Sequence, residues 1–231
     1  MSAPEVRGLS SMATRTLLAE LAAQVSAAGP TRVSFESAGG VEVAKRIRAG
    51  ATADLVVLAA DAIERLVHDG LLRRETVVPL FRSEVVAAIP EGSAPPPVGT
   101  VEELQAALLA TRRIGYSTGP SGDALLTMVD RWGLGERLAG RLVQAPPGVP
   151  VGRLLAEGGA DLGFQQRSEL LGVPGVRVLG ELPEGARITT IFTGAVLTAA
   201  ADPQGARSVL SALGSADLDP IVLRHGLAPA R

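Results

Sequence analysis

Four short polar turns each follow an apolar segment and precede a segment with helical periodicity. They are Ser10 with Ser11, residues 37–40 (SAGG), residues 117–122 (STGPSG), and Gln165 with Gln166. In open α/β sheets, ligands bind at the carboxyl ends of the strands. A helix that begins there offers free N–H groups and the positive end of its dipole. The four turns therefore predict a site in which hydroxyls and backbone amides bind a small anion.

Each turn also has a purely structural explanation. A serine pair such as Ser10 and Ser11 can cap a helix, and Gly39 with Gly40 can supply the backbone angles of a tight turn. The proline in residues 117–122 suits the first position of a helix. The amide of Gln166 follows a strand that should be buried, so it faces either a cleft or the backbone. Because the pattern recurs four times, we favour ligand contact.

The composition excludes several kinds of chemistry. The 231 residues include no cysteine, which excludes disulfides, thiol catalysis and cysteine-based zinc sites. The two histidines, His68 and His225, lie far apart in the sequence, which argues against a histidine metal cluster. The formal net charge is −2, so no global charge points to nucleic acid. We therefore expect no cofactor, no metal and no nucleic-acid partner.

The sequence contains no segment with the length and apolar character of a transmembrane helix, so we expect no membrane insertion. The N-terminal residues MSAPEVRGLSS lack the basic start and apolar run of a signal peptide. As the chain is written, we expect a cytoplasmic protein. If a signal was removed, the protein is periplasmic or extracellular.

Short apolar segments alternate with helical patterns, which predicts an α/β fold with mainly parallel sheets flanked by helices. The expected strands are 6–9, 32–35, 54–58, 77–80 with 84–89, 113–116, 160–164, 176–179, and 188–191 with 194–197 after a break. The expected helices are 12–28, 41–48, 61–68, 100–110, 123–132, 136–142, 149–157, 203–213 and 218–225. Extended segments near 77–89 and 186–198 indicate two lobes joined by two crossings.

Several stretches resemble the molybdate-type solute-binding proteins, a branch of the type II periplasmic binding protein fold. The most specific are RIRAGATADLVVLAAD (46–61) and ADLGFQQRSELL (160–171), supported by GLSSM near the start and IGYSTGPSGDALL in the middle. The resemblance covers nearly the whole chain. It implies two lobes, 1–81 with 195–231 and 82–194, a ligand cleft between them, and two hinge strands.

The resemblance also implies which positions hold the ligand. In the molybdate branch, hydroxyls and backbone N–H groups from both lobes bind the oxyanion. Carried over motif by motif, these positions are Ser10, Ser11, Ser37, Gly39, Gly40, Ser121, Gly122, Val151 and Gln166. No residue stands out as catalytic.

Three features depart from the molybdate pattern. The second turn has one hydroxyl, that of Ser37, where the molybdate branch has two or more. Gln166 stands where that branch usually has a tyrosine, and the third turn contains T-G-P-S-G. These features resemble a sister branch associated with organic polycarboxylates, which includes aconitate-isomerase-like proteins. The ligand class therefore stays open between an oxyanion and an organic polycarboxylate.

Further charged residues lie near the predicted turns. Arg153 and Arg167 are candidate partners of a ligand carboxylate, because arginine binds carboxylates in a bidentate manner. His68 and His225 are expected to be solvated residues at the ends of helices.

Three functions fit these observations. The first is a binding protein that closes around an anion and hands it to an ABC transporter permease. The second is an aconitate-isomerase-like enzyme, in which Glu36, Ser37 or Tyr116 would have to abstract the proton next to a carboxylate. The third, a ligand-sensing regulator lobe, ranks last because the sequence shows neither a helix-turn-helix motif nor a basic patch.

Overall fold

The computed structural model describes residues 5–231, and the chain divides into two compact units. Unit 1 consists of the described residues up to Ser83 together with Ile191–Arg231, and unit 2 is Glu84–Thr190. The first four residues lie outside the described part of the chain. The expected lack of a signal peptide rests partly on these residues.

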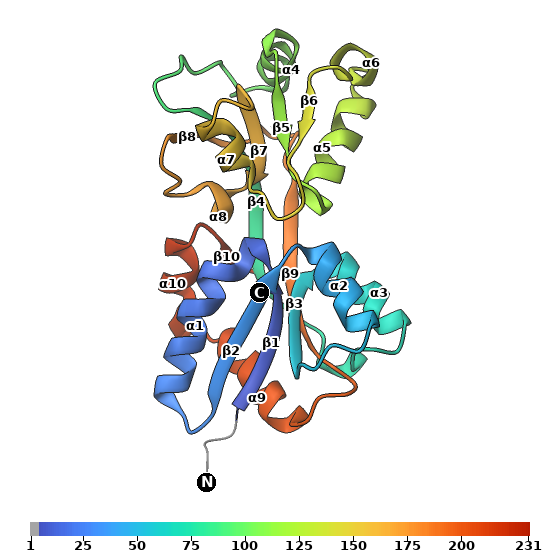
Figure 1. The fold of residues 1–231 in the computed structure, drawn as a ribbon. Coiled ribbons are helices and arrows are strands. Elements are labelled where there is room, and N and C mark those ends of the chain that lie inside the picture. Colours follow the sequence, from blue (N-terminus) through green and yellow to red (C-terminus); the bar gives the residue numbers. More distant parts are fainter. Residues whose placement is uncertain (1–4) are drawn as a thin grey trace. The chain divides into compact units, whose positions relative to one another are not determined.

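Unit 1 is built on a mixed sheet whose centre is parallel (Figure 1). Its strands are β1 (Glu5–Ser11), β2 (Arg32–Ala38), β3 (Leu55–Ala59), β9 (Thr189–Val196) and the short β10 (Ala228–Pro229). Strand β1 runs parallel to both β2 and β3, whereas β9 is antiparallel to β3. Strand β10 pairs with the first part of β4 (Val78–Pro90).

Helices cover both faces of the unit 1 sheet. They are η1 (Met12–Thr14), α1 (Arg15–Ala28), α2 (Gly40–Arg48), α3 (Ala60–His68), η2 (Arg74–Thr76), α9 (Pro203–Leu213), η3 (Ala216–Leu218) and α10 (Asp219–Arg224). One core packs α1, α9 and α10 against the sheet, and a second packs α2 and α3 against its other face. Leu17 and Leu210 belong to the first core, Val43 and Ile63 to the second. This two-sided burial explains why β3 is apolar throughout.

Unit 2 repeats the design with a smaller sheet (Figure 1). Its strands are the rest of β4, β5 (Ile114–Tyr116), β6 (Leu142–Gln144), β7 (Leu162–Gln166) and β8 (Val176–Glu181), and its helices are α4 (Val101–Ala110), α5 (Pro120–Arg131), α6 (Gly135–Leu138), α7 (Val151–Ala156) and α8 (Arg167–Leu170). Strand β5 is parallel to β6 and β7, and β4 is antiparallel to β7 and β8. Helices α4 and α5 pack on one face, α7 and α8 on the other.

The expected α/β fold class is confirmed, but several elements differ from the expected pattern, including the short elements η2, α8, η3 and β10, which were not expected. The break expected within residues 188–197 is wrong, because β9 is continuous through Gly194. A Cβ at Gly194 would lie 2.5 Å from the side chain of Leu210, so this glycine allows close packing. The segment 136–142 is a helix only over α6, and the short strand β6 follows it. Residues 12–14 form the 3₁₀ turn η1 before α1.

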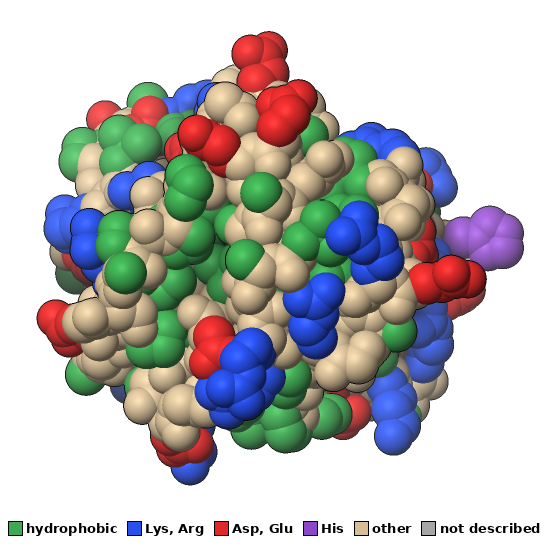
Figure 2. Space-filling view, turned by 90° about the horizontal axis from the view of Figure 1, so that it is seen from above, with side chains coloured by type: hydrophobic (Ala, Val, Ile, Leu, Met, Phe, Trp, Pro, Cys, Tyr) green, Lys and Arg blue, Asp and Glu red, His purple; other side chains and the backbone are tan. Residues whose placement is uncertain are grey.

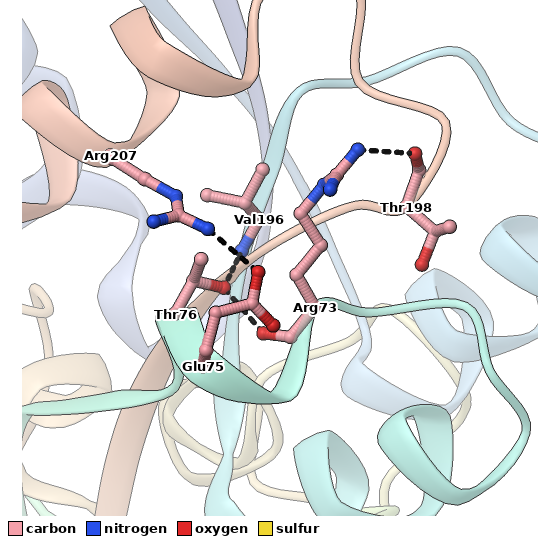
Figure 3. Close-up of polar contacts among 6 residues, drawn as sticks. All are labelled: Arg73, Glu75, Thr76, Val196, Thr198 and Arg207. Atoms are coloured by element: carbon pink, nitrogen blue, oxygen red, sulfur yellow. Dashed lines mark hydrogen bonds and ion pairs between the residues drawn. The ribbon is translucent and has the colours of Figure 1, made fainter.

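A polar cluster ties the segment that leads into β4 to the end of β9 (Figure 3). The hydroxyl of Thr76 donates to the carbonyl of Arg73 at 2.6 Å and accepts the buried N–H of Val196 at 2.9 Å. The Arg73 guanidinium donates to the carbonyl of Thr198, and Arg207 pairs with Glu75 at 2.6 Å. The segment before β4 and the end of β9 are therefore joined by one buried hydrogen bond, from Val196 to Thr76, with more exposed polar contacts around it.

A second long-range contact joins the first and last helices of unit 1. Glu20 of α1 accepts a hydrogen bond from Arg224 at 2.5 Å and lies 2.7 Å from His225 Nε2. The hydrogen bond with His225, and then the charge of Arg224, lower the pKa of the Glu20 carboxyl. The ionised carboxylate therefore stabilises the packing of α10 on α1.

We predict that Thr76→Val destabilises the protein by about 1–3 kcal/mol, because the buried N–H of Val196 loses its acceptor. The free energy of urea unfolding measures this. Thr198→Val is the matched control, because its hydroxyl makes an exposed bond to Gly70, and it should change stability by less than about 0.5 kcal/mol. Equal effects of the two substitutions would contradict the assigned role of Thr76.

We predict that the stabilisation lost in Glu20→Gln depends on pH. Because the folded-state pKa of Glu20 is lowered, its contribution is present above the unfolded pKa of about 4.5 and is lost as the pH falls through the folded value. Urea midpoints at pH 7, 5.5, 4.5 and 3.5 should show wild type and variant converging at low pH. The neutral variant Ser208→Ala, on the exposed side of α9, should keep a constant offset from wild type. A constant offset for Glu20→Gln would contradict the prediction.

Candidate functional site

The carboxyl ends of β1 and β2 form the polar edge of unit 1. The parallel register sets Ser10 opposite Ser37, and their hydroxyl oxygens lie 2.7 Å apart. Ser10 is fully buried and Ser37 is half-buried. One hydroxyl donates to the other, so one hydroxyl proton of the pair is left to donate elsewhere. The pair can therefore offer a hydrogen-bond donor to an anion.

Helix α2 begins directly beyond this pair. Its N-cap, Gly39, has no side chain to cap the first turn, and a Cβ there would meet nothing within 4 Å. The first N–H groups of a nine-residue helix are left without partners inside the helix. Gly39 and Gly40 therefore leave the backbone donors of α2 open to a small ligand.

Ser11 has a structural role in the same edge. Its hydroxyl caps η1 by accepting the N–H of Ala13 at 3.4 Å, and its carbonyl accepts the hydroxyl of Thr14 at 3.0 Å.

A cavity of about 270 Å³ also lies in unit 1, lined by Arg7, Gly8, Leu9, Ser34, Phe35, Glu36, Thr52 and Ala53. Ser10 and Ser37 are not among the residues that line this cavity, although Leu9 and Glu36, which line it, directly precede them.

Unit 2 also has a serine pair at a polar edge, although both serines come from the single turn between β5 and α5. Strands β5 and β7 are parallel with Tyr116 opposite Phe164, so the turn after β5 and the end of β7 lie at one edge. The hydroxyls of Ser117 and Ser121 lie 2.8 Å apart, and Ser121 is buried at the start of α5. As in unit 1, the pair shares one hydrogen bond and keeps one proton to donate.

Two glycines shape the turn that opens α5. Gly119 has a φ of +122°, which is open to glycine and disfavoured for other residues. A Cβ at Gly122 would lie 1.9 Å from the backbone oxygen of Ser117, so no side chain fits there. The turn is therefore closed tightly enough for Ser117 and Ser121 to bond across it.

The two neighbouring glutamines at the end of β7 have different environments. Gln165 is 3% exposed and fully bonded: its Oε1 accepts the N–H of Val151 at 2.7 Å and its Nε2 donates to Glu169 at 2.9 Å. The N–H of Val151 is thus already bonded within unit 2. Gln166 is equally buried, but only its Nε2 is bonded, to the Thr190 hydroxyl at 2.7 Å, and its Oε1 has no partner.

The other charged candidates are mostly bonded within their own units. Arg153 pairs with Glu157 on the surface of α7, whereas the buried Nε of Arg167 has no hydrogen-bond partner among residues 5–231. His68 is exposed at the end of α3, as expected. His225, expected to be solvated, is instead half-buried against Glu20, because α10 packs on α1.

Two of the three candidate bases, Glu36 and Tyr116, are poorly placed for proton abstraction. Glu36 makes a bidentate ion pair with Arg46 at 2.7 and 2.9 Å, and these hydrogen bonds and the arginine charge lower the pKa of Glu36. A carboxylate with a lowered pKa is a weaker base. Tyr116 is half-buried against the core of α4 and α5. Neither residue presents a free base beside the serine pairs.

The described part of the chain contains neither a cluster of metal-ligand side chains nor a helix that could cross a membrane. Within residues 5–231, no three His, Asp or Glu side chains cluster as metal ligands would. None of the helices in that range combines the length and apolar character that a membrane crossing needs. Acidic, basic and hydrophobic side chains intermingle on the face shown in Figure 2, without one extended patch of a single sign.

Comparison with known proteins places this fold in a family. The sequence matches the bacterial extracellular solute-binding protein family over residues 6–228. An aconitate isomerase from Pseudomonas sp is 30% identical over 188 residues, which cover 81% of this chain and 71% of the relative.

Solved structures agree with this fold assignment. The periplasmic molybdate-binding protein of Azotobacter vinelandii superposes with a TM-score of 0.81 at 19% identity, over 98% of this chain and 100% of that one. The substrate-binding protein of an ABC transporter from Agrobacterium tumefaciens gives 0.77 at 21% identity, over 98% and 79%. With its family match spanning nearly the whole chain, this protein belongs to the bacterial extracellular solute-binding proteins.

Proposed function

We propose that this protein binds a small anion, and that the hydroxyls and backbone N–H groups of its two polar edges are the groups that bind it. The observation that carries the proposal is the repeated construction of these edges. In unit 1 the buried Ser10, at the carboxyl end of β1, is paired with Ser37 next to the start of α2, and in unit 2 the buried Ser121, in the first turn of α5, is paired with Ser117 just after β5. Such positions combine hydroxyl donors with the positive end of a helix dipole.

The ligand-binding residues follow from this arrangement. Ser10, Ser37, Gly39 and Gly40 serve from unit 1, with Ser11 as the cap that positions η1. From unit 2 we propose Ser121, Gly122 and Gln166. Val151 contributes indirectly, because its N–H fixes the amide of Gln165 beside Gln166.

We further propose that the protein delivers its ligand to an ABC transporter outside the cytoplasmic membrane. Membership of an extracellular solute-binding family supports this, as does the fold shared with the ABC-transporter protein of Agrobacterium tumefaciens. A periplasmic or extracellular location fits this role, and it requires export of the protein.

A panel of anions tests the proposal. The panel contains molybdate, tungstate, sulfate, phosphate, citrate, cis-aconitate, trans-aconitate and tricarballylate. A ligand that binds the folded state raises the melting temperature by mass action, so at least one anion should give a concentration-dependent rise. Calorimetric titration of the anion with the largest shift then gives its Kd. If no anion raises the melting temperature or releases heat, the proposal fails.

We predict that Ser10→Ala weakens binding of that anion by about 10-fold or more, because a hydrogen bond to a charged group is lost. Calorimetric titration measures the change in Kd. Ser208→Ala removes a hydroxyl that bonds only within α9, and it should leave the Kd unchanged. Equal affinities of wild type and Ser10→Ala would remove Ser10 from the site.

An aconitate-isomerase-like activity is a second candidate, favoured by the 30% identity to the Pseudomonas enzyme. The pairing of Glu36 with Arg46 and the packing of Tyr116 argue against a free base. A ¹H NMR time course with trans-aconitate decides the question. We expect binding without turnover, and formation of cis-aconitate that depends on enzyme concentration would establish the isomerase instead.

A further inference from the structure

Gln165 and Gln166 are a natural pair for comparison, because they are adjacent, chemically identical and equally buried at 3% exposure. Both amide atoms of Gln165 are hydrogen-bonded: its Oε1 accepts from the N–H of Val151, and its Nε2 donates to Glu169. Gln166 is anchored only through its Nε2, and its Oε1 is inaccessible to solvent and unbonded. A buried acceptor without a donor destabilises a fold, so it calls for a specific explanation.

The alternation of side chains along β7 shows which way the Gln166 amide faces. Phe164 and Leu162 belong to the core formed with α4 and α5, whereas Gly163 faces Val151 and Leu155 of α7. Gln166 lies two residues beyond Phe164, so its side chain is on the α5 face of the sheet. Ile188 belongs to the same core, and Thr190, two residues later, receives the hydrogen bond from the Gln166 amide.

The amide oxygen therefore lies at the edge of the sheet where α5 begins. Strands β5 and β7 are parallel, so the carboxyl end of β5, from which the chain turns into α5, is at the same edge as Gln166. Helix α5 has 12 residues, and Ser121 and Gly122 occupy its first turn. This edge thus presents donors from the helix start and one buried acceptor from Gln166.

The orientation of the amide can be argued from its anchor. Thr190 can accept from the amide NH₂ or donate to the amide oxygen, because a hydroxyl does both. The first arrangement leaves one buried carbonyl-type oxygen without a donor, whereas the second leaves a buried NH₂ group without an acceptor. Orphaned N–H groups are the rarer in proteins, so the arrangement with Nε2 bonded to Thr190 is favoured.

From these observations we infer that the ligand carries a hydrogen-bond donor, a hydroxyl or an acidic O–H, that binds Oε1 of Gln166 beside its anionic group. This inference rests on the proposed function and narrows it. Small hydroxy acids fit, and hydrogen phosphate fits by its remaining proton. Molybdate and sulfate, which offer only acceptors at neutral pH, do not. A site that leaves a buried polar group unpaired rejects a ligand lacking the matching group.

Matched ligands that differ by a single hydroxyl test the inference. Citrate and tricarballylate share three carboxylates, and malate and succinate share two, but only citrate and malate carry a hydroxyl. Calorimetric titration of wild type should give at least about 10-fold tighter binding of one hydroxylated acid than of its partner. In Gln166→Met/Thr190→Val, which removes both members of the hydrogen bond, the ratio should fall to about 1.

The ligand-free protein supplies an independent readout. Replacing both partners of a hydrogen bond by apolar groups of similar shape is nearly neutral, so the double variant should melt within about 1 °C of wild type or above it. Gln165→Met is the matched control. It removes the hydrogen bonds to Val151 and Glu169 and leaves the buried N–H of Val151 without an acceptor, so this variant should melt at least about 4 °C lower than wild type. Circular dichroism confirms that each variant is folded.

The outcomes separate the inference from the proposed function. If anions bind wild type but neither a hydroxylated acid over its partner nor hydrogen phosphate over sulfate is preferred, or the preference survives in the double variant, the inference is wrong and the proposed function stands. If the ligand-free double variant melts as low as Gln165→Met, Gln166 is structural and the inference is wrong. If no small anion of any kind binds, both are wrong.

Discussion

The parallel pairing of neighbouring strands is the constraint on which both polar edges depend. Parallel strands end at the same edge, so the register of β1 with β2 sets Ser10 opposite Ser37, and that of β5 with β7 sets the turn before α5 beside the glutamines. The connecting helices start at these edges as a consequence of the topology. Donors from residues far apart in sequence are thereby gathered at one edge of the unit 1 sheet.

The sequence predicts those parts of the structure whose contacts join residues that are close together in the chain. Residues 100–103 (TVEE) match the capping-box pattern, and Thr100 and Glu103 form both of its reciprocal hydrogen bonds at the start of α4. The apolar strand β3 and the amphipathic helices that flank it lie where their periodicity predicts. The pairing of Ser117 with Ser121 is also local, since a tight turn of glycines closes between them.

Long-range contacts were the part that the sequence could not supply. Strand β6 has three residues and exists because it pairs with β5, and His225 is held by Glu20, 205 residues away in the chain. Gln165 and Gln166 are adjacent residues of the same type, yet the alternation along β7 places the Gln165 side chain on the α7 side of the sheet and the Gln166 side chain on the α5 side. Which glutamine is satisfied depends on partners at positions 151 and 190, which only the fold brings near.

Two arginines near the polar edges have their charges balanced within their own units, whereas the buried Nε of Arg167 has no partner among residues 5–231. Near the second turn, the charge of Arg46 is balanced by Glu36, and in unit 2 that of Arg153 is balanced by Glu157. Where these arginines are neutralised, affinity for an anion is expected to come from neutral hydroxyls and helix N–H groups, which are directional and few. Directional donors discriminate by the number and placement of acceptors and donors on the ligand, whereas a guanidinium attracts any nearby carboxylate. Selectivity is therefore expected to depend on single polar atoms such as Oε1 of Gln166, and a change of one residue there would alter which solute is bound rather than whether one is bound.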